Sequence, residues 1–344
     1  MTIVVPFPEV TAAEEIPKVI RLSHNLYALS FSLMKLIPAR YILRRAVADG
    51  RIGADTVIVE TTSGTFGLAL AMQAAQLRRR LVLVSDPAID DRLHRRLTDL
   101  GAVVERVRGE AAVGGYQQAR LDRLAEVQAE RPDHFCPQQY SNTDNPRSYA
   151  LVAEILAEAL GQVDCVVGPV GSGGSMCGTV AFLRSLTPDC VAVGVDTHHS
   201  VLFGHPDGHR GLRGLGNSLM PQNLDHRTFD SVHWCSDSLA YQATRLLHRR
   251  HSLFKGPTSG AAYQVARWWA AANPDAVTVA MLPDDGSRYQ DTVYDDGWLR
   301  DGGHLRPPLP DEPRPVSDAG DASGQWTSFA WERRTLDDVR AVAR

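Results

Sequence analysis

Short apolar runs alternate with longer helical patterns through most of this chain, and this alternation limits the fold more than any other feature. Leu81–Ser85, Cys165–Gly168 and Thr278–Leu282 have the composition of buried strands, whereas Gly67–Leu77 has that of a helix. Strands that alternate with helices form parallel βαβ units. We therefore predict an α/β protein with open, twisted, mostly parallel sheets flanked by helices.

The pattern occurs in two blocks, roughly 40–150 and 151–300, and changes after Asp301. Residues 301–325 are rich in Pro, Gly, Ser and Asp, a composition that cannot bury a core. We predict a flexible tail over 301–344, with a short helix near its end that docks on a partner subunit.

Composition excludes several classes of function. The formal net charge of −4 gives no basic surface for nucleic acid or for anionic membrane. The N-terminal segment lacks a charged region followed by an apolar core, so we predict no secretory signal. The apolar runs are too short to span a bilayer. Five cysteines without a C-x-x-C pair favour reduced thiols in a cytoplasmic protein and predict no metal site.

A glycine- and serine-rich turn lies between a predicted strand and a predicted helix. Gly171-Ser172-Gly173-Gly174-Ser175 follows the apolar run that begins at Cys165. Glycines let backbone N–H groups converge on an anion, and a helix N-terminus adds a positive dipole. The spacing fits neither a dinucleotide fingerprint nor a P-loop. We interpret the turn as a phosphate cup; the alternative is a tight turn without a ligand.

Two other turns also precede predicted helices. Thr62-Ser63-Gly64-Thr65 offers hydroxyls and N–H groups that suit a carboxylate, and Thr258-Ser259-Gly260-Ala261 precedes a helix with the sequence AAYQVARWWAAA. Ordinary helix capping by Ser or Thr is the alternative for both turns.

Together these turns resemble the pyridoxal-phosphate-dependent β-family (fold type II), in particular the cysteine synthases. That family has TSGNTG, GTGGTxxG and SSGA in this order. Here the three motifs read Thr62-Ser-Gly-Thr-Phe-Gly67, Gly171-Ser-Gly-Gly-Ser-Met-Cys-Gly178 and Thr258-Ser-Gly-Ala261. Pro137–Pro146 is similar to its QQFxNxxNP segment, and Gly211–Gly216 to its flexible GIG loop. The resemblance covers roughly residues 25–300.

The resemblance also implies a cofactor lysine. The family reads GSxKDRPAxYxI, and Ser32–Ile42 keeps a lysine with Pro, Ala, Tyr and Ile at matching offsets. Lys35 is then the residue that binds pyridoxal phosphate as a Schiff base. Its apolar neighbours Met34 and Leu36 favour the neutral amine that this chemistry requires. The alternative is a lysine that snorkels at a helix start.

The remaining roles follow position by position from the resemblance. A small, mobile domain is expected over 40–150, and a larger domain that binds the cofactor phosphate over 1–39 and 151–300, with the cofactor between them. The implied contacts are as follows: Gly171, Ser172, Gly173, Gly174 and Ser175 hold the phosphate, Thr258 bonds the pyridine nitrogen, Thr65 lies beside the cofactor, and Thr62, Ser63, Gly64, Thr65 and Gln139 bind the substrate carboxylate.

Three further segments, Gly114–Tyr116, Val195–Gly204 and Leu282–Tyr294, are similar to those of one subgroup of the family. This subgroup uses O-phosphoserine to make N-(2-amino-2-carboxyethyl)-glutamate for 2,3-diaminopropionate in secondary metabolism. Arg213 lies in the loop where O-phosphoserine-using members carry an arginine, which can bind a phosphate leaving group. The resemblance thus implies β-replacement on O-phospho-L-serine or O-acetyl-L-serine through an aminoacrylate, by a sulfur or amine nucleophile, in a homodimer.

Two other functions stay open at this stage. One is a serine or threonine dehydratase or a β-lyase on the same fold. The other is a non-catalytic homologue that binds the cofactor. Two features support the second: Thr65 in place of the family's Asn, and a segment before Lys35 that is several residues shorter and lacks the family's NPxG element.

Overall fold

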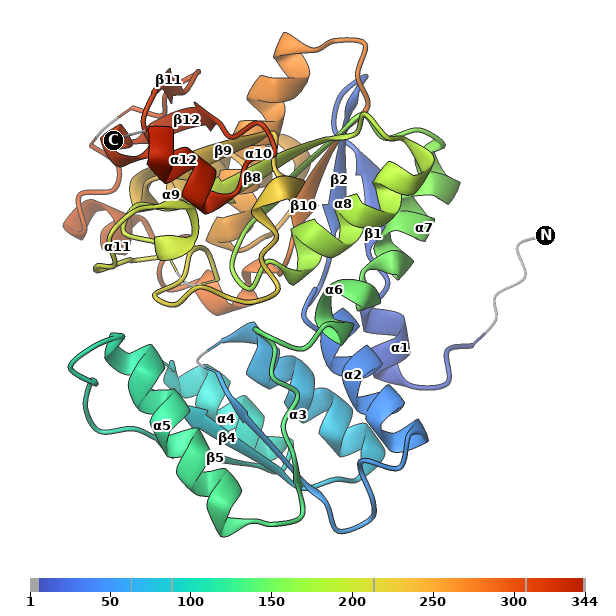
Figure 1. Cartoon of the computed structure of the whole chain (residues 1–344). Coiled ribbons are helices and arrows are strands. Elements are labelled where there is room, and N and C mark those ends of the chain that lie inside the picture. Colours follow the sequence, from blue (N-terminus) through green and yellow to red (C-terminus); the bar gives the residue numbers. More distant parts are fainter. Residues whose placement is uncertain (1–5, 63, 88, 213, 307, 343–344) are drawn as a thin grey trace. The chain divides into compact units, whose positions relative to one another are not determined.

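The computed structural model describes residues 6–62, 64–87, 89–212, 214–306 and 308–342. Two compact units are present in the chain (Figure 1). The first contains Phe31–Gln138 and the N-terminal segment that ends at Pro17. The second contains Lys18–Ser30 and the chain from Gln139 onward.

The first unit is built on a parallel sheet with the strand order β5-β4-β3-β6. Strands β3 and β4 are fully buried, because helices cover a parallel sheet on its faces. Its elements are α1 (Val10–Glu14), α2 (Leu36–Ala48), β3 (Val57–Thr61), α3 (Thr65–Leu77), β4 (Leu81–Ser85), α4 (Asp91–Asp99), β5 (Ala102–Arg106), α5 (Gly115–Glu130) and β6 (His134–Phe135).

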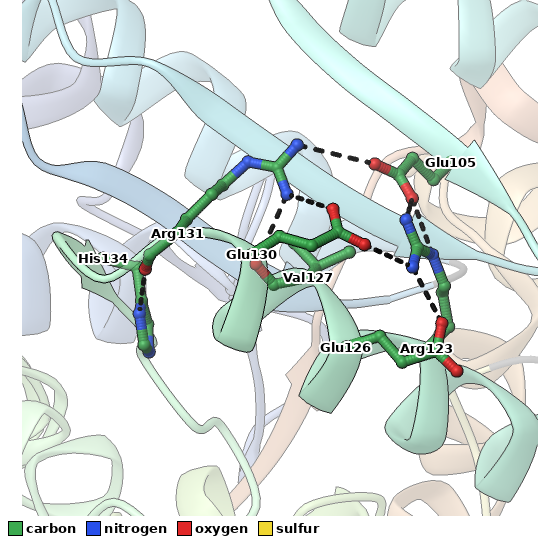
Figure 2. A network of polar contacts seen from close by, with 7 residues as sticks. All are labelled: Glu105, Arg123, Glu126, Val127, Glu130, Arg131 and His134. Carbon is green, nitrogen blue, oxygen red and sulfur yellow. Dashed lines mark hydrogen bonds and ion pairs between the residues drawn. The ribbon is translucent and has the colours of Figure 1, made fainter.

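An ion-pair network ties α5 to β5 (Figure 2). The Arg123 guanidinium lies 2.8 Å from Glu105 on β5 and also pairs with Glu126 and Glu130 on its own helix. Arg131 joins Glu130 at 3.1 Å. Exposed pairs are individually weak, but a shared network orients the helix on the edge strand of the sheet.

The second unit contains an eight-stranded mixed sheet with the order β1-β2-β10-β7-β8-β9-β12-β11. The pairs from β2 through β9 are parallel, and β1 and β12 add antiparallel to the two sides of that block. Its strands are β1 (Lys18–Arg21), β2 (Leu26–Ser30), β7 (Cys165–Pro169), β8 (Val191–Asp196), β9 (Ser231–Cys235), β10 (Thr278–Leu282), β11 (Arg314–Pro315) and β12 (Trp326–Ala330).

Helices of the second unit connect and cover these strands. They are α6 (Asp144–Ser148), α7 (Ala150–Leu160), α8 (Gly174–Leu186), α9 (Asp237–His251), α10 (Pro257–Ala272), α11 (Asp296–Asp301) and α12 (Leu336–Val342). Helix α10 packs on α9 and on β10 and β7, and its buried face joins the main core of the unit. The α/β class and the mostly parallel sheets expected from the sequence are confirmed.

The C-terminal region differs from the flexible tail that its composition predicted. Residues 326–330 form β12, which pairs with β9 from Trp326↔Cys235 to Ala330↔Ser231, beside it in Figure 1. Trp326 and Trp331 are buried there. The aromatic residues late in the segment supply the apolar surface that the Pro/Gly-rich stretch before them lacks.

The boundaries of the two units also differ from the expected ones. The sequence placed all of 1–39 with the larger unit, but only Lys18–Ser30 of that segment, which contains β1 and β2, belongs to it. Lys35 and the start of α2 belong to the first unit instead, because α2 packs on α3.

Candidate cofactor and substrate site

The predicted phosphate cup lies where β7 ends and α8 begins. Gly173 has φ +82°, a conformation that glycine adopts without cost, and a Cβ there would lie 2.7 Å from the Cα of Leu224. Ser172 and Ser175 are buried. The first N–H groups of α8 have no partner within the helix, so the turn presents donors and a positive dipole end.

An asparagine that the sequence analysis did not single out supports this turn. The Asn145 Nδ2 donates to the carbonyl of Gln139 at 2.6 Å and lies 3.4 Å from Ser172 Oγ. Its buried Oδ1 has no partner among the described residues, and a side chain on Gly174 would collide with it. The Asn223 Nδ2 also donates to the Gln139 carbonyl, at 3.0 Å. These two asparagines fix Gln139 beside the cup.

Thr258 lies in the first turn of α10, behind Pro257 at the helix start, and is 3% exposed. Ser259 is fully buried, and its Oγ has no partner among the described residues. A buried hydroxyl without a partner costs free energy, which a ligand can recover. Ser259 is therefore a second hydroxyl candidate that the sequence analysis passed over.

The loop that resembles the GIG loop lies against the cup and against the start of α10. The N–H of Gly216 donates to the carbonyl of Val170, directly before the cup, at 2.9 Å. A Cβ on Gly171 would lie 3.5 Å from the carbonyl oxygen of Gly214, and a Cβ on Gly214 would lie 3.8 Å from Thr258 Cγ2. Arg213 lies outside the described residues.

A buried carboxyl lies at the base of the same loop. Asp196 ends β8, is fully buried, and accepts from the N–H of Thr197 at 2.8 Å. Burial raises the pKa of Asp196 to about 7. A Cβ on Gly216 (φ +75°) would lie 3.0 Å from its Oδ1, so the loop packs directly on this carboxyl.

In the first unit, Lys35 lies immediately before α2, at its N-cap position. Its side chain is partly buried, and its neighbours Met34 and Leu36 are buried. Desolvation lowers the pKa of Lys35 to about 8, which increases the neutral, nucleophilic fraction near neutral pH. The apolar flanks of Lys35 predict a shift in this direction.

Thr62 and Thr65 lie at the start of α3, which packs on α2. The Thr62 Oγ1 accepts from the N–H groups of Gly64 at 3.2 Å and Gly67 at 3.3 Å. That is the capping role given above as the alternative to substrate binding. Gly64 and Thr65 are partly exposed at this helix start, and Ser63 lies outside the described residues.

Among the candidate residues, the structure brings the cup, Gln139, Thr258 and the 214–216 part of the loop together within the second unit. Lys35, Thr62, Gly64 and Thr65 lie in the first unit, at the starts of two adjacent helices. Asn145 belongs to the Asn-Pro pair of the QQYSNTDNP segment, which was the available signal for it.

These residues fit pyridoxal phosphate. The cup offers backbone donors and two buried hydroxyls for a phosphate. Thr258 and Ser259 offer neutral hydroxyls for a ring nitrogen, and Lys35 offers an amine with a lowered pKa for an aldehyde. No group of three or more His, Cys, Asp or Glu side chains in the described ranges is arranged to hold a metal ion.

The fold and these elements define an α/β enzyme with a candidate phosphate-binding turn and a candidate cofactor lysine. The family model described as "Pyridoxal-phosphate dependent enzyme" matches residues 21–284. The chain belongs to this family, whose members depend on pyridoxal phosphate.

Two curated relatives carry the same name, N-(2-amino-2-carboxyethyl)-L-glutamate synthase. The protein from Cupriavidus metallidurans is 36% identical over 268 residues, which are 76% of this chain and 79% of that protein. The protein from Ralstonia nicotianae is 37% identical over 265 residues, which are 76% and 78% of the two chains.

A solved structure shows the same fold. The O-acetylserine dependent cystathionine beta-synthase from Helicobacter pylori superposes with a TM-score of 0.77 at 24% identity, over 84% of this chain and 99% of that one. In the part of the chain that the structure describes, no helix has the length and apolar character needed to cross a bilayer.

Proposed function

We propose that this protein catalyses a β-replacement on an O-activated L-serine, with O-phospho-L-serine as the substrate and L-glutamate as the nucleophile. The C–O bond at Cβ breaks, phosphate leaves, and the glutamate nitrogen forms a C–N bond to Cβ. Bound pyridoxal phosphate supplies the electron sink that acidifies the Cα–H bond and lets the β-substituent leave.

One observation carries this proposal: the cup, Thr258 and the 214–216 loop segment are packed together at the carboxyl ends of parallel strands. This edge is where open α/β sheets bind ligands. The name of the two curated relatives supports L-glutamate as the nucleophile, since it describes a glutamate that carries a 2-amino-2-carboxyethyl group.

The chain's own residues divide the work. Lys35 would hold the cofactor through its side-chain amine, and the same amine, once released, would take the substrate's Cα proton and return it. The residues that would hold the cofactor phosphate are Gly171, Ser172, Gly173, Gly174 and Ser175, and Thr258 would hydrogen-bond the ring nitrogen. Gly64, Thr65 and Gln139, with Thr62 and Ser63, bind the substrate carboxylate, and Arg213 binds the leaving phosphate.

Assembly and location are part of the proposal. The homodimer is supported by Phe7, Val10 and Tyr41, which expose large apolar side chains on or beside α1 and α2. A cytoplasmic location is supported by five free cysteines, four of them buried. Light scattering on the purified protein would measure its mass in solution and so test the homodimer.

Borohydride reduction of the cofactor-loaded protein tests the lysine assignment. We expect an irreversible phosphopyridoxyl adduct on the peptide that contains Lys35, and none in Lys35→Ala. The matched control is Lys18→Ala, which removes an exposed lysine of β1 and should leave the adduct in place. An adduct on Lys255, or on no lysine, would refute the assignment.

A substrate comparison tests Arg213. In Arg213→Ala we expect kcat/KM for O-phospho-L-serine to fall by about tenfold or more, and that for O-acetyl-L-serine to change much less. Arg306→Ala removes an exposed arginine of the same unit and is the control. An equal loss with both substrates would contradict the assignment to the leaving group.

A further inference from the structure

The chain after residue 284 lies outside the part that the family model matches. Within it, residues 314–336, here called the C-terminal extension, contain β11 and β12 and widen the sheet of the second unit. The extension also contacts a segment far from it in sequence, residues 198–205, here called the histidine segment.

Two histidines of that segment donate to carbonyl groups of the extension. The Nε2 of His198 lies 2.8 Å from the carbonyl oxygen of Gly324, and that of His205 lies 2.9 Å from the carbonyl oxygen of Ala319. A carbonyl oxygen only accepts, so each ring carries its proton on Nε2. Burial lowers the pKa of both histidines, and both rings are therefore neutral donors at neutral pH.

Aromatic stacking fixes the orientation of one of these rings. His205 stacks on Trp234 of β9 with ring centroids 5.0 Å apart and an interplanar angle of 10°. Trp234 is fully buried, and β9 pairs with β12 of the extension. The His205 ring is thus held by packing, and its N–H is directed at Ala319.

The histidine segment also contacts the loop that resembles the GIG loop, and residues 211–217 are here called the substrate loop. The Ser200 Oγ accepts from the N–H of Asn217 at 3.1 Å, and the N–H of Val201 donates to the Asn217 carbonyl at 3.0 Å. Asn217 follows Gly216, whose N–H donates to the Val170 carbonyl before the cup. The histidine segment therefore lies between the extension and the loop that lines the cup.

We propose that the C-terminal extension positions the substrate loop through His205, with His198 as the second support. His205 is a positioning residue, since it acts through Ser200 and Asn217 and contacts neither the cup nor Thr258 in any hydrogen bond described above. The kinetic part of this inference rests on the proposed function, but the structural part does not.

Two substitutions of His205 distinguish the effect of its N–H group from the effect of its ring. His205→Phe keeps a ring to stack on Trp234 and removes the donor, whereas His205→Gln keeps an N–H near the Nε2 position and removes the ring. His24→Phe is the matched control, because His24 Nε2 donates to the carbonyl of Pro274 at 3.1 Å in the same unit, away from the loop.

Hydrogen–deuterium exchange of the full-length protein tests the structural part. In His205→Phe we expect amide exchange of the peptide over 211–217 to accelerate roughly fivefold, the effect of losing one neutral hydrogen bond. His205→Gln and His24→Phe should match the wild type, and the β10 peptide should be unchanged in all. Faster exchange confined to 319–324 would overturn the proposal.

Kinetics with O-phospho-L-serine tests the functional part. His205→Phe should raise KM roughly fivefold, with kcat and cofactor affinity within about twofold of wild type, and His205→Gln should restore KM. Equal losses of cofactor affinity and turnover in both variants would show general unfolding and overturn the positioning role. His198→Phe repeats the measurement if His205→Phe does not fold. Absence of turnover in the wild type would refute the proposed function but not the structural part of this inference, which the hydrogen–deuterium exchange tests separately.

Discussion

The N–H of Gly216 donates to the carbonyl of Val170 at 2.9 Å, and this bond joins the substrate loop to the strand that ends in the phosphate cup. In the proposed function, this bond would join the loop to the turn that holds the cofactor phosphate. A change in the loop backbone at Gly216 would therefore act on the residue directly before the cup.

Gly173→Ala should weaken the binding of pyridoxal phosphate by about tenfold or more. Alanine at φ +82° costs about 1 kcal/mol, and its Cβ would press on the Leu224 backbone. Gly161→Ala is the control, since Gly161 has φ +74° but nothing lies within 4 Å of a Cβ there. Fluorescence titration of the apoprotein with pyridoxal phosphate measures the cofactor affinity of each variant. Equal affinities in the two variants would contradict the role of the cup.

Cofactor incorporation should depend on pH through Lys35. Because desolvation lowers the pKa of this amine to about 8, the neutral fraction and the rate of incorporation should rise up to about pH 8 and then level off. Stopped-flow absorbance of apoprotein mixed with pyridoxal phosphate measures the rate. A rate that continues to rise toward pH 10, where an ordinary lysine titrates, would contradict this environment.

Asp196→Asn should remove part of the pH dependence of stability. The folded-state pKa of Asp196 is about 7, above its unfolded value near 4, so its contribution is fully present below pH 4 and is lost as pH rises to 7. We expect the free energy of unfolding of the wild type, relative to that of the variant, to decline over this window. Urea denaturation at successive pH values measures it. A difference that grows with pH would show the opposite sign and refute the assignment.

Trp331→Ala should destabilise the protein by about 3–5 kcal/mol, the usual cost of removing a buried tryptophan. Trp331 is fully buried, packs edge-on against Phe203 at 5.0 Å and stacks with His226 at 5.6 Å. Leu305→Ala, at a half-exposed position, should cost far less. Chemical denaturation compares the two. A loss near zero for Trp331→Ala would mean that the C-terminal region behaves as the flexible tail its composition suggests.

Much of the fold could be predicted from local patterns. The runs at Leu81–Ser85 and Thr278–Leu282 coincide with β4 and β10, because strands buried on both faces read as continuous apolar segments. Strands β9 and β12 were not predicted. In SVHWC and WTSFA, polar residues interrupt the apolar run, and their burial depends on pairing between segments about 90 residues apart.

The candidate site remains a prediction, and it could be proposed from the sequence where a distinctive residue type marks it. The glycines of the cup and the apolar flanks of Lys35 are such signals. Asn145 and Ser259 were missed because their importance lies in buried polar atoms without partners, which only the packed structure reveals. Thr62 is a residue that the sequence singled out but whose hydroxyl has an ordinary structural role, since it caps α3 as any Thr before a helix can.

The most direct test of the account is to identify the product that the cofactor-loaded protein forms from O-phospho-L-serine and L-glutamate. Mass spectrometry should detect N-(2-amino-2-carboxyethyl)-L-glutamate and equimolar phosphate with the wild type, and neither with Lys35→Ala. Release of pyruvate and ammonia with no carbon–nitrogen coupling, under the same conditions and with sulfide as the alternative nucleophile, would contradict β-replacement and identify an elimination enzyme.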